Sequence, residues 1–237
     1  MKTTCYLYLA GCCAPLILAT PANATFTGLS TETRTNAFGL DVISVYADFD
    51  RPGDQLTAIA GTPLSPLTLS VIGGTFYQHA LGSDLAPLDT LVAMFPSLAF
   101  DTFVTIGVEI FDIDGDGGGQ PQNFTLMTPG WPGFGPGSLS TMSSGWFVPP
   151  FSPEANPFDP TYVAGDGRTL IAQLATTDGT GFEGTMLVSF MDSFGVPGST
   201  QATFTHVVPA PGTLALLGLA GLLGRRRRRL SNGGGPL

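Results

Sequence analysis

The chain has 237 residues, 43% of them hydrophobic and 11% charged, and a formal net charge of −9 at pH 7. Its nine basic residues are Lys2, five consecutive arginines near the C-terminus, and Arg34, Arg51 and Arg168 between these two ends. Residues 25–208 therefore hold three arginines against all eighteen acidic residues, a formal charge of about −15, and this acidity excludes nucleic acid and anionic membrane as expected ligands of the region.

The first 24 residues have the three parts of a secretory signal peptide. Lys2 supplies a positive charge, a mostly apolar stretch follows, and Ala22 and Ala24 are the small residues of an A-x-A cleavage site. We therefore expect signal peptidase to cleave before Thr25, so that the protein is exported through the inner membrane.

All three cysteines, Cys5, Cys12 and Cys13, lie in this leader. An alternative interpretation is that residues 9–12 form a lipobox and that Cys12 is acylated. This alternative explains less, because it would leave the apolar residues 15–18 in the mature protein. Cleavage after residue 24 would instead remove every thiol, and the mature protein would contain no disulfide.

Residues 25–208 are long enough for one domain with a sizeable core. The chain contains 32 glycines and 20 prolines. Long patterns with the helical period are missing, whereas short runs of β-forming residues recur between turn residues. The pattern predicts an all-β domain, an antiparallel β-sandwich (jelly-roll-like) of about nine or ten strands, flanked by an N-terminal signal helix and a short C-terminal hydrophobic helix.

Two β-hairpins are predicted where turn residues separate strand-like runs. In the first, strands at 41–49 and 55–60 flank a turn at 51–54. In the second, two strands flank residues 177–180, where Asp178 and Gly179 would supply the positive φ angles of a tight turn. The strands of the second hairpin are 169–176 and 184–190, and the other predicted strands are 67–72, 75–78, 91–95, 103–111 and 201–208.

Residues 129–160 interrupt this pattern with eight prolines and both tryptophans. Because proline cannot donate to a β-ladder, we expect most of the interval to be loop. Two interpretations stay open for its large rings: they form a surface that stacks on sugar or on a partner, or they fold back over the core as a lid. The rings are Trp131, Phe134, Trp146 and Phe151.

One motif has the spacing of metal ligands. Asp112, Asp114 and Asp116 correspond to positions 1, 3 and 5 of an EF-hand loop, and Gly117 stands at position 6, whereas Asn123 replaces the bidentate Glu of position 12. We therefore predict that the three aspartates bind calcium in a loop that follows a strand. The alternative is an ordinary solvated turn.

Support for catalysis is sparse in the sequence. His79 and His206 are the two histidines, and neither a nucleophile elbow nor a zinc-binding helix motif accompanies them. A carboxylate pair could be drawn from the eighteen acidic residues, so a secreted glycan-active enzyme, a hydrolase or lyase, is the alternative function. A cleft with two facing carboxylates and aromatic walls would favour that alternative.

Residues 209–237 form a tail of three parts. Pro209, Ala210 and Pro211 keep the chain extended, residues 213–224 are apolar, and a basic block follows: Arg225, Arg226, Arg227, Arg228 and Arg229. Basic clusters remain on the cytoplasmic side of a membrane segment, so the preceding domain should lie outside. As a helix the apolar run would rise about 18 Å against roughly 30 Å of hydrocarbon, which favours a transient anchor.

This layout of the tail resembles the PEP-CTERM sorting signal of bacterial exported proteins. The resemblance implies processing by an exosortase-like enzyme and association with extracellular polysaccharide. We therefore expect a non-enzymatic structural or binding protein of the cell envelope or extracellular matrix, anchored in the membrane at least transiently by residues 213–224.

Overall fold

The computed structural model describes residues 26–34, 36, 38–162 and 166–208. The expected signal peptide (1–24) and sorting tail (209–237), with the two flanking helices, lie outside these residues. Strands make up 43% and helices 8% of the structure, and every pair of named strands is antiparallel. The predicted all-β class is therefore confirmed.

The strands form two sheets of unequal size. The four-stranded sheet has the order β1 (Phe26–Arg34), β2 (Asp41–Phe49), β9 (Arg168–Thr176) and β5 (Phe103–Val104). The seven-stranded sheet contains β6 (Leu126–Met127), β8 (Gly145–Phe147), β3 (Gln55–Ala60), β10 (Gly181–Met191), β4 (Leu67–Ile72) and β7 (Ser138–Thr141) in that order, with β11 (Pro197–Val207) paired to β10. Among the described residues, three short helices accompany the sheets: α1 (Asp89–Met94), η1 (Pro96–Phe100) and η2 (Pro153–Ala155).

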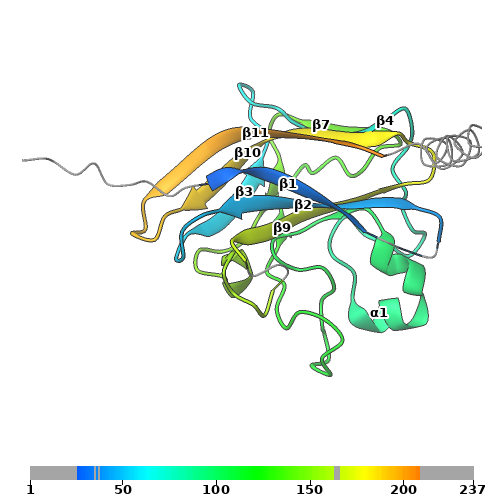
Figure 1. Ribbon diagram of the computed structural model, residues 1–237, viewed down its shortest axis with the longest axis horizontal. Helices are drawn as coiled ribbons and strands as arrows, with labels where there is room; N and C mark the ends of the chain where they lie inside the picture. The colour runs from blue at the N-terminus through cyan, green and yellow to red at the C-terminus, as the bar shows by residue number, and fades with distance from the viewer. Residues whose placement is uncertain (1–25, 35, 37, 163–165, 209–237) are drawn as a thin grey trace, which may run out of the picture.

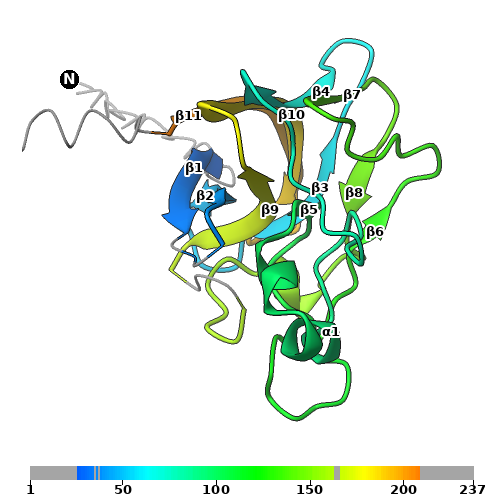
Figure 2. The ribbon, with the colours of Figure 1, turned by 90° about the vertical axis from the view of Figure 1, so that its right-hand side faces the viewer.

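The main core lies between the two sheets. Val45 and Ile171 come from the smaller sheet, and Leu69 and Phe182 come from the larger one; all four are fully buried in one cluster. Figure 1 shows β1, β2 and β9 running beneath β10 and β11, and Figure 2 separates the two layers and places α1 below them. Burial alternates along β4, as a sheet with one core-facing side requires.

The smaller sheet is covered on its second face as well. Val42 and Ala175 point away from the main core and pack with Leu40 against Tyr77 and Phe100. A further cluster joins Ala86, Phe103, Val108 and Tyr162. Nearly every residue of β2 and β9 is therefore buried, and the loops and short helices act as a third layer, which we call the cover.

The first predicted hairpin is wrong in its pairing, although the bounds of both strands are correct. β2 pairs with β1 and β9, whereas β3 pairs with β10 and β8, so the turn at 51–54 carries the chain from one sheet to the other. The reason lies in a contact that the sequence does not display. Asp54 is fully buried, and its carboxylate accepts the backbone N–H of Ser193 from the turn between β10 and β11 (3.0 Å).

The second predicted hairpin is also wrong in its pairing. β9 lies in the smaller sheet and β10 in the larger one, and Gly179 is not among the glycines with positive φ. The carboxylate of Asp178 does not close a hairpin turn. It accepts the N–H of Thr75 (2.9 Å), in the segment after β4, and the hydroxyl of Thr176 (3.1 Å). The long hairpin of the structure joins β10 and β11.

Other predicted strands changed type or length. Residues 91–95 lie mostly in helix α1, residues 75–78 contribute a single bridge from Phe76 to Thr176, and the run 103–111 is reduced to the two residues of β5. Short apolar runs do not distinguish strand from helix by period alone. Four strands of the described chain were not predicted from the sequence: β1, β6, β7 and β8.

Candidate metal centre

Four aspartates converge beside the N-terminus of α1. One carboxylate oxygen from each of Asp89, Asp112, Asp114 and Asp116 lies within 4.8 Å of the others. The structure thus brings together the three aspartates that the sequence predicted and adds Asp89. Asp89 and Asp112 are buried, whereas Asp114 and Asp116 are exposed.

Backbone pairing fixes the position of Asp89. The N–H of Asp89 donates to the carbonyl of Phe111 (3.0 Å), and the N–H of Phe111 donates to the carbonyl of Pro87 (2.9 Å). Asp112, Asp114 and Asp116 lie in one loop, which we call the acidic loop. At its base, the N–H of Asp112 donates to the carbonyl of Gln120 (2.9 Å). The two halves of the site are therefore held by main-chain hydrogen bonds that do not depend on the carboxylates.

The acidic loop also organises its own carboxylates. Asp112 accepts the N–H groups of Gly115 (2.6 Å) and Gly117 (2.9 Å), and both glycines have positive φ, near +79° and +92°. Residues with a Cβ rarely adopt such angles. These N–H donors, that of Gly117 first, hold the pKa of Asp112 below its usual value, so Asp112 is a carboxylate at neutral pH.

The donor set fits Ca²⁺. Calcium prefers oxygen ligands at about 2.3–2.6 Å, so two oxygens on opposite sides of one ion are separated by about 5 Å, compatible with the 4.8 Å spread. Asp89 and Asp116 also line a hollow of about 290 Å³ together with Thr90, Val92, Ala93 and Gly118. Asn123, at position 12 of the loop comparison, instead accepts the N–H of Thr125 (3.1 Å).

The large rings of residues 129–160 are arranged mainly as a lid. Trp146 is fully buried and donates to the carbonyl of Thr105 (2.9 Å). Trp131 packs edge-on against Trp146, with ring centroids 5.7 Å apart, and Phe134 contacts the core as well. Phe151 is the exception, with 72% of its surface exposed. The structure therefore favours the lid over an aromatic binding surface.

The two histidines lie in separate places and do not form a catalytic group with each other. His206, on β11, bridges the sheets, because its ring nitrogens contact the hydroxyls of Thr31 (2.9 Å) and Thr33 (3.2 Å) on β1. Burial lowers the pKa of His206. His79 lies in the loop after β4, where its Nδ1 accepts the N–H of Leu81 (3.1 Å).

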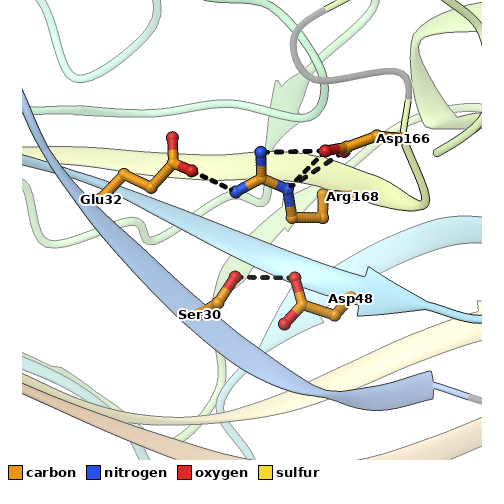
Figure 3. A network of polar contacts seen from close by, with 5 residues as sticks. All are labelled: Ser30, Glu32, Asp48, Asp166 and Arg168. Atoms are coloured by element: carbon orange, nitrogen blue, oxygen red, sulfur yellow. Dashed lines mark hydrogen bonds and ion pairs between the residues drawn. The ribbon is translucent and has the colours of Figure 1, made fainter.

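A second charged cluster lies on the smaller sheet, where the carboxylates outnumber the single guanidinium. Figure 3 shows the guanidinium of Arg168 between Glu32 and Asp166, at 2.6 Å and 3.0 Å. Ser30 donates to Asp48 beside it (2.7 Å). Because its charge is balanced by two carboxylates, Arg168 is a poor anion-binding group.

The comparisons with known proteins gave no relative: no family model, no curated protein and no solved structure matches the chain. Within the described residues, none of the helices has both the length and the apolar character needed to cross a membrane. The predicted cleavage site (Ala22, Ala24) and the sorting residues (Pro209, Ala210, Pro211 and 225–229) lie outside the described part of the chain.

We expect millimolar Ca²⁺ to raise the melting temperature of the wild type by several degrees, because an ion that binds only the folded state stabilises it by mass action. Asp89→Asn and Asp114→Asn should each remove most of this gain. Both variants should also melt higher than the wild type in EDTA, since each removes one of four crowded negative charges. Differential scanning calorimetry measures both effects.

Asp50→Asn is the matched control, because Asp50 is exposed and lies outside the cluster. Its calcium response should equal that of the wild type. If all four proteins melt identically with and without Ca²⁺, the acidic loop is only a turn.

Proposed function

We propose that this chain is an exported, non-enzymatic structural or binding protein of the cell envelope or extracellular matrix, whose domain binds Ca²⁺ and associates with extracellular polysaccharide. The observation that supports it most is the cluster of four aspartates, because a carboxylate set held by main-chain hydrogen bonds suits a hard cation. The PEP-CTERM-like tail supplies the proposed route of delivery. The jelly-roll-like description of the sandwich and the two flanking helices are part of the same proposal.

The outer face of the larger sheet is the best candidate for contact with polysaccharide. The strand register places two rows of exposed or half-exposed side chains across β7, β4, β10 and β11. The rows are Ser140, Thr68, Thr185, Thr203 and Ser138, Ser70, Glu183, Thr205. The seven hydroxyls can both donate to and accept from the hydroxyls of a neutral glycan, and the carboxylate of Glu183 can accept from them.

This hydroxyl face is also hollowed. A depression of about 330 Å³ is lined by Thr68, Thr185 and Thr203, with Glu183, Gly184, Phe204 and Thr205 beside them. The depression adds a concave shape that a chain of sugars could enter.

The glycan-active enzyme remains the alternative, and its geometric requirement finds little support. The hollow beside the four aspartates has two carboxylates but no aromatic wall, and the depression on the hydroxyl face has a single carboxylate. Catalytic carboxylates of glycosidases are about 5–10 Å apart with sugar between them, whereas the clustered aspartates lie closer together.

The hydroxyl face can be tested by removing hydroxyls without changing side-chain shape. Thr185→Val and Thr203→Val should each weaken binding to the extracellular polysaccharide of the source organism about fivefold, because one neutral hydrogen bond contributes about 1 kcal/mol. Affinity electrophoresis measures the change. Thr27→Val, on an exposed position of the other sheet, should bind as the wild type does; equal binding by all variants would reject this face.

The tail can be tested separately from the domain. Ending the chain at Val208 should leave the melting temperature within about a degree of that of the full chain, because Pro209 and Pro211 separate the last strand from the apolar run. Replacing residues 225–229 with Ser should misroute the protein, since the positive charges keep the tail end in the cytoplasm. Unfolding on truncation, or normal delivery of the Ser variant in fractionated cells, would mean that the tail is structural.

A further inference from the structure

Asp101 is a buried carboxyl group that the metal centre does not use. It follows η1 directly, and only 1% of its surface is exposed. Its Oδ1 accepts the backbone N–H groups of His79 (2.7 Å) and Thr102 (2.9 Å). Its Oδ2 is buried and has no hydrogen-bond partner. A carboxylate oxygen in this position would be desolvated without compensation.

The surroundings of Oδ2 suit a carboxylic acid better than a carboxylate. Oδ2 fills the space in which a side chain on Gly82 would lie, and the carbonyl oxygen of His79 borders the same space. That carbonyl already accepts the N–H of Gly82 (2.8 Å) and has a second lone pair. A protonated Oδ2 could donate to it, whereas an ionised Oδ2 would face another acceptor.

A negative charge near Asp101 acts in the same direction, and the other facing groups are neutral. Asp84, at the end of the loop formed by residues 78–84, carries a negative charge and accepts the indole N–H of Trp131 (2.9 Å). Tyr77 precedes the loop; burial, and then the charge of Asp101, raises its pKa. From β9 the facing group is the neutral Gln173, which donates to the carbonyl of Asp101 (2.7 Å).

Burial is the main cause that raises the pKa of Asp101, to about 7. The N–H groups of His79 and Thr102 lower this pKa, and the charge of Asp84 raises it. The group therefore changes its charge near neutral pH.

Asp101 holds the middle of a loop that is otherwise fixed at its ends. The loop, residues 78–84, begins after the N–H of Tyr77 donates to the carbonyl of Ala175 (2.7 Å) and ends where the carbonyl of Asp84 accepts the N–H of Val104 (2.9 Å). Its Leu81, Gly82 and Ser83 line a largely apolar hollow of about 410 Å³, together with Leu98, Phe111 and Thr125. The loop therefore forms one wall of this hollow.

We propose that Asp101 is a proton-operated clasp on loop 78–84: the carboxylic acid holds the loop against η1 and β5, and the carboxylate loosens it, which frees one wall of the hollow. The folded-state pKa lies above the ordinary value of 3.8. The stabilisation from this group is thus fully present below pH 3.8 and is lost as the pH rises through about 7. Acid closes the loop, and neutral to basic pH releases it.

Amide hydrogen exchange of the full chain tests the clasp between pH 5 and 8.5. After correction for intrinsic rates, protection of the His79 and Gly82 amides should fall about tenfold for each pH unit between roughly 5 and 7 and then level off. In Asp101→Asn the side-chain amide keeps an oxygen acceptor at the position of Oδ1 and places an NH₂ donor at the position of Oδ2. Its loop protection should stay at the acid value throughout.

Glu154→Gln is the matched control. Glu154 is also fully buried, with one oxygen accepting the N–H of Phe124 (2.7 Å) and the other unpartnered, but it lies on η2. This variant should keep the pH dependence of the loop. A wild-type loop whose protection ignores pH, persistent dependence in Asp101→Asn, or its loss in Glu154→Gln would each overturn the proposal.

A direct titration keeps the proposal falsifiable if Asp101→Asn does not fold. The ¹³C resonance of the Asp101 carboxyl in the wild type should shift with a midpoint at about 7. A midpoint near the ordinary 3.8 would mean that the folded structure does not destabilise the carboxylate, and the clasp would be rejected.

Discussion

Burial of one apolar layer between two sheets of unequal size is the constraint on which the rest of this structure depends. The larger sheet shields only one face of the smaller one, so the second face of β2 and β9 needs a cover. Residues such as Phe100 and Tyr162 supply it from loops and short helices. The side chains that we assign to the calcium site and the clasp all belong to this cover; among them are Asp89, Asp101 and Asp112.

The difference between the sheets and the cover explains where the buried aspartates lie. The sheets bury Val, Ile, Leu and Phe side chains, and the hydroxyls of the larger sheet lie at exposed or half-exposed positions. The cover contains irregular backbone whose N–H groups need acceptors. Aspartate carboxylates satisfy many of these donors, as Asp112 does for Gly115 and Gly117. The same side chains that complete the backbone hydrogen bonding therefore create the candidate calcium site and the clasp.

The sequence predicted the positions of several strands correctly, missed others and failed on strand pairing. The bounds of β2, β3 and β4 were correct because alternating apolar residues between turn residues are a local signal. The pairing failed where a turn joins two sheets, since the deciding contacts, such as Asp54 with Ser193, are distant in sequence. The site shows the same limit: the spacing of Asp112, Asp114 and Asp116 was visible, but the pairing of Leu88 with Phe111, which brings in Asp89, was not. The buried Asp101 had no sequence signal.

The central claim, an exported domain that binds calcium, is tested most directly by native mass spectrometry of the protein from its natural source. We expect a polypeptide that begins at Thr25 and carries one Ca²⁺ that EDTA removes. A mass that retains residues 1–24, a diacylglyceryl group on Cys12, or the same mass with and without EDTA would contradict it.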